Sequence, residues 1–567
     1  MRILGIHDGH NASACLIEDG EIRLAIQEER LANEKNKAGF PFESVKLILK
    51  NAQLSPRDIN KAVFASRHSS AVFATVDHFN KKNYLLRNLE ILGMKTPLYS
   101  WYKWQRRQER IRQACSLGFT PRQIVFADHH KCHAATAYYG SHFPRNEKIL
   151  VLTNDGAGDN LCATVSIGYN NQLTQLASVH RDHSLGGVYC LVTKMLGFKP
   201  LEHEYKLMGM SPYCSKKGEH KGYLLFKDLI SLSKKDPLKF KKNGSRPIAL
   251  LMPHLQKVTQ FQRFDWICAG LQKFTEEILI SWVRNCISAT GIKKIALAGG
   301  IFMNVKANKK IMELPEVEDM FVFPSCGDET ISIGAAYKTY AYFKQSKDPE
   351  ISPLQHFYLG DTFSDKAVRE NILLFRSQLP FKVKKIKNIE LAVARLLAQK
   401  KIVARCKGRM EFGARALGNR SILADPANLH CLREINLLVK KRDFWMPFAP
   451  VILSERVSDY LINPKKIASP YMILSFDTTS RYKELIAAVH QADLTARPQV
   501  IDKQSNPDYY SILKEFEKIT GRGALLNTSF NLHGFPIVYG PKEALEVFRD
   551  SDLKYLALGN YLLEKEN

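Results

Sequence analysis

A pattern of short strands and tight turns occurs twice in this 567-residue chain. Alternating apolar residues predict three strands in each copy. The expected strands are residues 2–7, 12–17 and 21–27 in the first copy and residues 148–154, 161–168 and 173–179 in the second. An Asp-Gly pair follows the first strand of each copy, Asp8-Gly9 and Asp155-Gly156, and there we predict a sharp turn. The repeat therefore predicts two similar lobes that share a cleft.

Strand-opened lobes with an Asp-Gly turn resemble the superfold of actin, hexokinase and the heat-shock ATPases. The resemblance implies that the two turns face each other across the phosphates of a bound nucleotide. Two unrelated hairpins are the alternative, because hairpins with Asp-Gly turns are common.

Helical periodicity and a polar linker define the rest of the organisation. Apolar residues at helical spacing predict helices over residues 42–53 and 265–290, the second ending at Gly291. The stretch 344–355 carries two prolines and few apolar residues. We therefore predict an N-terminal domain of residues 1–345 and a separate α/β domain of residues 346–567.

Composition limits the classes of protein to consider. Lys and Arg number 82 against 56 Asp and Glu, a net charge of +26, which raises nucleic acid, anionic membranes or phosphorylated substrates as partners. The basic residues are dispersed, which favours a solvated cationic surface instead. No apolar run reaches the ~20 residues of a membrane helix, and the N-terminus does not read as a signal peptide. The eleven cysteines include no CxxC pair, so we expect reduced, buried thiols and a cytoplasmic enzyme.

Two histidines four residues apart are the sharpest local signal. On a helix, His129 and His133 share one face, a spacing that suits two imidazoles on one metal ion. The zinc-protease motif needs Glu at position 130, which is His here. With Asp155 in the second turn and Asp328 before a run of small residues, the four form a mixed N/O set suited to iron or another divalent metal. A structural pair of histidines is the alternative.

Nucleotide motifs of the common kinds are absent. No Gly-Lys dipeptide occurs, so the chain has no Walker A loop. Gly299-Gly300 follows a short strand, where backbone amides could bind phosphate or sugar, although a plain tight turn would look the same. Lys206 and Gly209 form a second, cationic candidate.

One histidine beside the first turn is a candidate general base. His10 could accept a proton, with Asn11 orienting its ring, or it could be structural.

The C-terminal part is rich in fixed positive charge. Residues 408–421 contain three Arg and three Gly, among them Arg415 and Arg420. Lys440, Arg497 and Asn527 add further cationic and amide groups. Guanidinium forks on a glycine-rich backbone favour a pocket for a phosphate or carbamoyl oxygen, and a solvated basic surface is the alternative.

These residues together resemble the NodU/CmcH-type O-carbamoyltransferases of nodulation-factor and antibiotic biosynthesis. The matching stretches, in the order of the family, are HNASACL (10–16), HHKCHAATAYY (129–139), TNDGAGD (153–159), YKLMGM (205–210), LAGGIFMN (297–304), GRMEFGARALGNRS (408–421), VKKRDFWMPFAP (439–450) and LNTSFN (526–531).

The resemblance implies an actin-like N-terminal domain, similar to the tRNA threonylcarbamoyladenosine transferase, and a YrdC-like C-terminal domain. It implies that the C-terminal domain forms carbamoyl-adenylate from ATP and carbamoyl phosphate. The N-terminal domain then transfers the carbamoyl group to a hydroxyl of a sugar or natural product. Residues 71–115 and 231–261 are expected to shape the entry of that acceptor.

The resemblance also assigns roles to the candidate residues. It implies iron on His129, His133, Asp155 and Asp328, and a base or substrate-orienting role for His10. By the same resemblance, Lys206, Gly209, Gly299, Gly300 and Asn304 lie near the adenylate, and Arg415, Arg420, Lys440, Arg497 and Asn527 near carbamoyl phosphate and nucleotide. Mg²⁺ is a candidate for the adenylation step. Many members of the family have Asp where this chain has Asn11, and Asn cannot stabilise an imidazolium as a carboxylate would.

Two other functions are alternatives to this one. Hydrogenase-maturation carbamoyltransferases carry CxxC pairs and the opposite domain order, neither of which fits this chain. An RNA-binding or tRNA-modification subunit would use the net charge, but not the predicted metal set.

Overall fold

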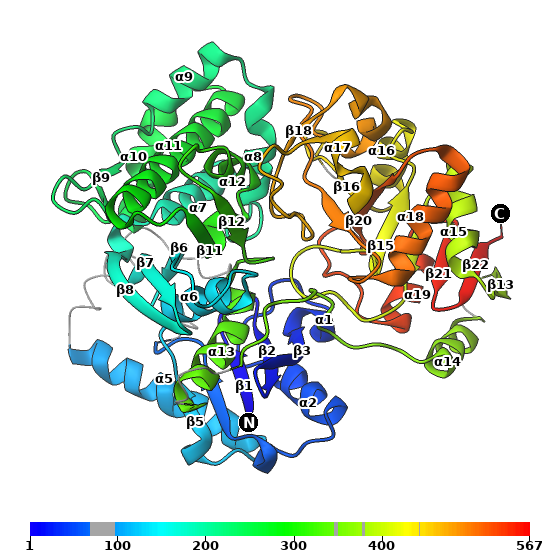
Figure 1. Ribbon diagram of the computed structural model, residues 1–567, viewed down its shortest axis with the longest axis horizontal. Helices are drawn as coiled ribbons and strands as arrows, with labels where there is room; N and C mark the ends of the chain where they lie inside the picture. The colour runs from blue at the N-terminus through cyan, green and yellow to red at the C-terminus, as the bar shows by residue number, and fades with distance from the viewer. Residues whose placement is uncertain (69–96, 345–349, 377–379, 441–442, 567) are drawn as a thin grey trace. The chain divides into compact units, whose positions relative to one another are not determined.

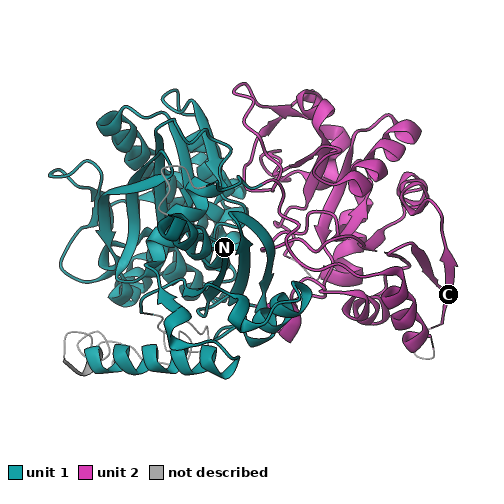
Figure 2. Cartoon of the chain, turned by 60° about the horizontal axis from the view of Figure 1, so that its bottom comes forward, with its two compact units in different colours: residues 1–28, 36–354 teal, residues 29–35, 355–567 magenta. Residues whose placement is uncertain are grey.

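The computed structural model describes residues 1–68, 97–344, 350–376, 380–440 and 443–566 (Figure 1). The chain divides into two compact units (Figure 2). Unit 1 comprises residues 1–28 and 36–354, and unit 2 comprises residues 29–35 and 355–567. The boundary that the sequence predicts after residue 345 lies outside the described residues. Unit 2 thus includes a short segment from the N-terminal part of the sequence.

Unit 1 contains two five-stranded sheets with the same topology. The first has the order β3-β2-β1-β4-β5 and the second the order β8-β7-β6-β11-β12. In each sheet the first three strands form an antiparallel meander, and the last two run parallel to the first strand. The predicted duplication into two lobes is therefore confirmed.

Each strand of the second sheet is longer than its counterpart in the first. The strands of the first sheet are β1 (Arg2–His7), β2 (Ser13–Glu18), β3 (Glu21–Gln27), β4 (Lys61–Phe64) and β5 (Ile124–Phe126). Those of the second are β6 (Ile149–Gly158), β7 (Leu161–Tyr169), β8 (Gln172–His180), β11 (Lys294–Ala298) and β12 (Asp319–Val322).

Two helices pack against each other between the sheets. Helix α6 (His129–Gly140) follows the first sheet in sequence but packs on β6, β7 and β11 of the second. Helix α13 (Ile331–Lys344) follows the second sheet but packs on β1, β2 and β4 of the first. Gly334 allows this close contact, because a Cβ there would lie 2.0 Å from the carbonyl oxygen of Cys132. The exchange brings the starts of both helices to the middle of unit 1.

The remaining elements of unit 1 surround the two sheets. They are α2 (Phe42–Asn51), α5 (Pro97–Ser116), α7 (Leu185–Met195), α8 (Glu204–Met210), α9 (Lys216–Leu224), β9 (Ile230–Leu232), β10 (Phe240–Lys242), α10 (Met252–Thr259), α11 (Phe264–Thr290) and α12 (Val305–Met312). Helix α11 ends as predicted, at Gly291 with a φ of 70°.

One turn is not where the sequence predicts it. The turn expected at Asp155-Gly156 is wrong, because β6 continues through both residues to Gly158. The pairing of β6 with β7 shifts register between Asn154 and Gly158, and the chain reverses at Asp159 and Asn160, whose φ values are 46° and 70°. A bulge of this kind leaves no trace in the hydrophobic pattern. The turns at Asp19-Gly20 and Asn170-Asn171, which join the second and third strands of each meander, have positive φ at both positions, as two-residue hairpin turns commonly do.

Unit 2 is built on one mixed sheet of eight strands, in the order β13-β22-β21-β14-β15-β20-β16-β19. Buried apolar residues form a core cluster around Ile422 and Leu526, and another around Leu423 and Leu525. Because side chains alternate along a strand, the two clusters occupy opposite faces of the sheet.

The elements of unit 2 are α14 (Asp365–Phe375), β13 (Phe381–Lys385), α15 (Ile389–Ala398), β14 (Val403–Cys406), β15 (Arg420–Ala424), α16 (His430–Ile435), β16 (Ala449–Leu453), α17 (Val457–Tyr460), β17 (Leu461–Ile462), β18 (Asp477–Thr478), β19 (Gln499–Ile501), α18 (Pro507–Thr520), β20 (Ala524–Ser529), α19 (Pro541–Arg549), β21 (Tyr555–Leu558) and β22 (Tyr561–Lys565). Helix α1 (Glu28–Ala32) begins in unit 1 and continues in unit 2.

The sequence also predicts reduced cysteines and no membrane span. The eleven cysteines form no disulfide within the described part of the chain, and nine of them are buried. Within the described ranges, no helix combines the length and the apolar character needed to cross a bilayer.

Candidate active site

The two histidines of the HxxxH pair lie at the start of α6. The helix begins at His129 because the Asp128 side chain caps it, accepting from the backbone N–H of Lys131 at 3.1 Å. His129 is 3% exposed and His133 is fully buried. Since the two are one turn apart, both imidazoles lie on the same side of α6.

Two carboxylates meet these imidazoles. Asp155, in the bulged part of β6, places Oδ2 3.3 Å from His129 Nε2. Asp328, in the turn that leads into α13, places Oδ1 3.3 Å from His133 Nε2 and 3.5 Å from His129 Nε2. The four ligand atoms lie within 4.8 Å of one another. We call these residues the quartet, and their convergence is what the sequence predicts for a metal site.

Backbone groups around the quartet fix its geometry. The N–H of Gly300 donates to Asp155 Oδ1 at 3.1 Å. Gly299 has a φ of 106°, and a Cβ there would lie 2.2 Å from the carbonyl oxygen of Asn154. Only glycine allows this approach, so the predicted Gly299-Gly300 pair supports a quartet carboxylate directly.

Asp159 is a supporting residue that sequence reasoning missed. One carboxylate oxygen, Oδ2, accepts from the backbone N–H of His129 at 2.9 Å and from that of Arg67 at 2.8 Å. The other, Oδ1, accepts from the N–H of His68 at 2.8 Å. Asp159 thus joins the turn after β6 to the start of α6. Its place in the matched stretch TNDGAGD was the only available signal.

The charges of the quartet balance one another. Burial disfavours a charged His129, but Asp328, Asp155 and Asp159 outweigh it and raise the pKa of this imidazole to about 9. Burial also raises the pKa of both carboxyls, yet the nearby imidazoles dominate and hold the pKa of Asp155 and of Asp328 below the usual value. The site is therefore arranged to hold positive charge between two carboxylates.

His10 lies beside the quartet. Its Nδ1 is 3.5 Å from Asp328 Oδ2. The carboxylate that faces the His10 ring therefore belongs to the turn that precedes α13. Asn11 adopts the left-handed conformation with a φ of 57°, as the turn requires. Asp328 thus faces the His10 ring, and the orienting role predicted for Asn11 stays a prediction.

A buried ion pair holds the turn that carries His10. Arg110 on α5 contacts both oxygens of Asp8, with Nε 2.7 Å from Oδ2 and Nη2 2.8 Å from Oδ1. The same guanidinium donates to the carbonyl oxygen of Ser66 at 3.0 Å and lies 4.4 Å from the ring centroid of Phe64. Sequence reasoning missed this pair, because its members are more than a hundred positions apart.

The predicted adenylate residues other than Gly299 and Gly300 border α11. Asn304 caps α12, accepting from Ala307 N–H at 3.0 Å, and exchanges two amide hydrogen bonds with Gln272 of α11. Lys206 is half-buried on α8, with Nζ 5.2 Å from the ring centroid of Phe198. Gly209 is buried on the same helix, which packs against α11.

In unit 2, residues 408–419 form a loop that leads into the first residues of β15; residues 408–421 are here called the arginine loop, and they are held together by hydrogen bonds among themselves. Glu411 is fully buried, and its Oε1 accepts from the backbone N–H groups of Leu417, Asn419 and Arg420 at 2.7, 3.2 and 3.1 Å. Arg420 is also buried and donates to the carbonyl oxygens of Tyr539, Gly408 and Asn419. The Arg420 guanidinium therefore stabilises the loop itself. The side chain of Arg415, in the same loop, is only half-buried.

The other predicted residues of unit 2 lie around this loop. Asn527 donates to the carbonyl oxygen of Ala416 at 3.1 Å. Gln499, which sequence reasoning missed, donates to that of Leu417 at 3.0 Å, two residues beyond the half-buried Arg497. Lys440 is buried at the end of a π-helical turn and donates to Ser529 Oγ at 3.0 Å and to the Asn531 side chain. Strands β15 and β20 are paired, so these groups share one region of the sheet.

Comparison with known families accounts for both units. The family model described as "Carbamoyltransferase N-terminus" matches residues 2–337, and that described as "Carbamoyltransferase C-terminus" matches residues 394–565. The chain belongs to the carbamoyltransferase family. The expected α/β class is confirmed, with a duplicated N-terminal part that has the two-lobed topology expected of an actin-like fold and a C-terminal α/β part built on one mixed sheet.

Individual relatives span almost the whole of this carbamoyltransferase. Nodulation protein NolNO of Sinorhizobium fredii is 30% identical over 98% of this chain and 79% of its own length. An uncharacterized protein of Methanocaldococcus jannaschii is 32% identical over 99% of both chains. Among solved structures, full-length HypF in its phosphate- and nucleotide-bound form matches 61% of this chain and 56% of its own, with 13% identity and a TM-score of 0.36.

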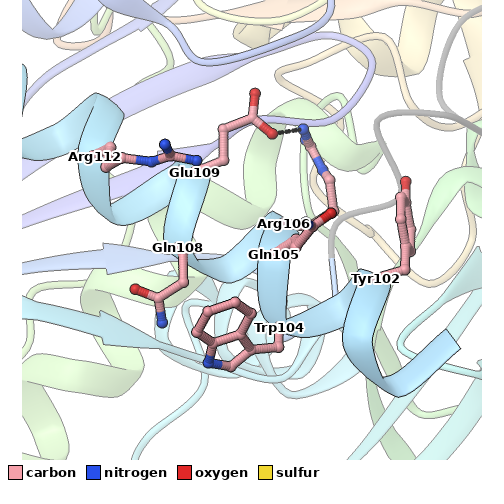
Figure 3. A pocket seen from close by; sticks show the side chains of 7 residues that line it. All are labelled: Tyr102, Trp104, Gln105, Arg106, Gln108, Glu109 and Arg112. Atoms are coloured by element: carbon pink, nitrogen blue, oxygen red, sulfur yellow. Dashed lines mark hydrogen bonds and ion pairs between the residues drawn. The ribbon is translucent and has the colours of Figure 1, made fainter. Parts of the chain in front are cut away.

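Helix α5 of the carbamoyltransferase also lines a hollow of about 640 Å³ (Figure 3). Its lining side chains are Tyr102, Trp104, Gln105, Arg106, Gln108, Glu109 and Arg112. Arg106 and Glu109 form an ion pair in the hollow. The segment 71–115, expected to shape acceptor entry, includes this helix, while residues 71–96 lie outside the described part of the chain.

Proposed function

We propose that this protein is an ATP-dependent O-carbamoyltransferase that makes carbamoyl-adenylate and transfers its carbamoyl group to a hydroxyl. The observation that carries the proposal is the convergence of two imidazoles and two carboxylates within 4.8 Å, in a chain of the carbamoyltransferase family. The tRNA-modification or RNA-binding alternative is not favoured, because both family matches are to carbamoyltransferases.

The quartet is a fitting site for a divalent transition metal. Two nitrogen and two oxygen donors suit iron, our first candidate, and other metals of the first row. A bound ion would act as a Lewis acid toward a phosphoryl or carbonyl oxygen. The chain's part is to hold four donors in place, through the Asp128 cap, the Gly300 amide and Asp159.

We assign carbamoyl-adenylate formation to unit 2. By atom balance, water and carbamoyl phosphate give carbamate and inorganic phosphate, and a carbamate oxygen then displaces pyrophosphate from the α-phosphorus of ATP. Both reactants are anions, so cationic groups are needed to offset their repulsion. Arg415, Lys440 and Arg497 are our candidates, with Asn527 beside the arginine loop and Mg²⁺ on the nucleotide.

We assign carbamoyl transfer to unit 1. The acceptor oxygen attacks the carbonyl carbon of carbamoyl-adenylate, and the bond to AMP breaks. His10 accepts the proton of the acceptor hydroxyl at Nε2, since its Nδ1 faces Asp328. Lys206, Gly209, Gly299, Gly300 and Asn304 would border the adenylate.

The acceptor in this proposal is a sugar or natural-product hydroxyl in the cytoplasm. Helix α5 supports it, because Arg110 on this helix holds the turn of His10, while Tyr102 and Trp104, earlier on the same helix, line the hollow. Aromatic faces next to polar side chains suit sugar rings. A panel of sugars and glycosides would identify the acceptor.

The proposal is tested with the purified protein, ATP and carbamoyl phosphate. We expect pyrophosphate release that depends on carbamoyl phosphate, and acceptors that gain the mass of one carbamoyl group. Lys440→Ala should lose pyrophosphate release, whereas Asp155→Ala should retain it and lose transfer. Tight, salt-sensitive RNA binding without pyrophosphate release would refute the proposal in favour of a binding subunit.

A further inference from the structure

A buried arginine of unit 2 comes from the N-terminal part of the sequence. Residues 29–35 belong to unit 2, although the residues before and after them belong to unit 1. The segment contains Arg30, in α1, which is only 3% exposed. A buried guanidinium is costly unless its N–H groups are hydrogen-bonded, so its partners indicate its role.

Arg30 binds the backbone of the arginine loop. Its Nη2 donates to the carbonyl oxygen of Gly413 at 2.6 Å, and its Nη1 donates to that of Ile537 at 3.2 Å. Gly413 has a φ of 88°, a conformation that favours glycine, and lies two residues before Arg415. Arg30 thus binds the loop at one of its three glycines with positive φ.

Glu411 holds the same loop at its other end. Its carboxylate collects three backbone N–H groups of residues 417–420, as described above. Between the two anchors, Arg415 is the residue with a half-buried cationic side chain. A planar guanidinium that donates to a loop carbonyl fixes both the length and the direction of the hydrogen bond. The ammonium group of a lysine does not fix the direction in this way.

We propose that Arg30 is a positioning residue for the arginine loop, and that the anion site of unit 2 depends on it for the placement of Arg415. The inference rests on the proposed function for its ligand, carbamoyl phosphate. It further means that the matched C-terminal region, residues 394–565, lacks one part of its own binding site.

The test compares Arg30→Ala and Arg30→Lys in the full-length protein. The matched control is Arg23→Ala on β3, where the arginine side chain is 62% exposed. The first measurement is hydrogen–deuterium exchange of the peptides covering residues 411–420. We expect about tenfold faster exchange in Arg30→Ala, a smaller increase in Arg30→Lys and no change in the control.

The second measurement separates positioning from general stability. The KM for carbamoyl phosphate in pyrophosphate release should rise about tenfold in Arg30→Ala and less in Arg30→Lys, while the midpoint of thermal unfolding and the metal content match those of Arg23→Ala. If Arg30→Ala does not fold, Arg30→Lys decides. Unchanged exchange, or an unchanged KM, in the folded variant overturns the proposal.

The two proposals fail in different ways. If the wild-type protein releases no pyrophosphate, the proposed function fails, and titration with carbamoyl phosphate followed by hydrogen exchange still tests Arg30. Protection of residues 411–420 by carbamoyl phosphate in wild type, and about tenfold weaker protection in Arg30→Ala, would support it. Equal protection in both would overturn it.

Discussion

The two lobes of unit 1 share one topology but use their Asp-Gly pairs differently. Asp8, after β1, is bound by Arg110, which also donates to the carbonyl oxygen of Ser66, two residues past the end of β4. Asp155, in the equivalent place on β6, faces His129 and receives the amide of Gly300, at the end of β11. In the first lobe a guanidinium therefore neutralises the Asp8 carboxylate, whereas in the equivalent place of the second lobe the Asp155 carboxylate faces an imidazole. Duplication supplies the framework, and the neighbour of each aspartate decides its chemistry.

The largest expected difference between the lobes is in metal binding. Asp155→Asn should lower metal affinity and carbamoyl transfer about 100-fold or more, because a neutral amide replaces a quartet carboxylate. Asp8→Asn should leave the metal content at the wild-type level, since Asp8 is not in the quartet. Elemental analysis of both variants after dialysis makes the comparison. Equal metal loss in the two would erase the distinction between the lobes.

The second expected effect is on the free energy of unfolding. Arg110→Met should lower it by about 3–5 kcal/mol, because the Asp8 carboxylate stays buried without its partner. The double variant Asp8→Asn with Arg110→Met should recover much of that loss. Urea denaturation of the two single variants and the double variant gives the coupling energy. Additive losses would mean that the two side chains do not act as a pair.

A third difference between the lobes is the residue before each Asp-Gly pair, which is His7 in the first lobe and Asn154 in the second. His7 is buried, and burial, with His10, outweighs the carboxylates of Asp328 and Asp8 and lowers the pKa of His7 to about 4. In the unfolded chain the pKa of this imidazole is about 6.5. The free energy of unfolding therefore decreases as the pH is lowered from about 6.5 to about 4. At pH 5 the loss attributable to His7 is about 2 kcal/mol.

Denaturant titrations at pH 7 and pH 5 measure this effect. The wild type should lose about 2 kcal/mol more than His7→Asn on acidification, and the exposed control His533→Asn should behave like the wild type. An equal acid sensitivity in wild type and His7→Asn would contradict the assignment.

The smallest expected effect concerns the glycine that supports the quartet. A Cβ on residue 300 would lie 2.8 Å from Asp155 Oδ1, so Gly300→Ala should displace the carboxylate slightly. We expect about tenfold weaker metal binding, measured by competition with a chelating dye, and an unchanged unfolding midpoint. Gly156→Ala, where a Cβ meets nothing within 4 Å, is the control. Tighter or equal binding in Gly300→Ala would show that this contact is dispensable.

The duplicated fold and the members of the quartet were predictable from the sequence. Strand periodicity and hairpin turns are local signals, and the HxxxH spacing fixes two imidazoles on one helix face. The sequence correctly predicts that the Asp155 carboxylate belongs to the quartet. The backbone turn predicted at Asp155 is wrong, because a bulge has no signature in the apolar pattern.

Contacts between distant segments were not predictable. Arg110 lies on a helix whose sequence gives no hint of a partner at Asp8, and Arg30 joins a unit whose other residues begin at 355. A contiguous motif can also mislead, because it does not show where each side chain points. The sequence presents Arg420 as a ligand group, whereas the structure directs its guanidinium to three backbone carbonyls.

Anomalous diffraction from crystals of the metal-loaded protein tests the central claim most directly. Data collected at the absorption edge of the bound metal should give one peak in unit 1, about 2.0–2.3 Å from the nearest nitrogen or oxygen of His129, His133, Asp155 and Asp328. A peak elsewhere, or no peak between these four side chains in crystals grown with excess metal, would contradict the account.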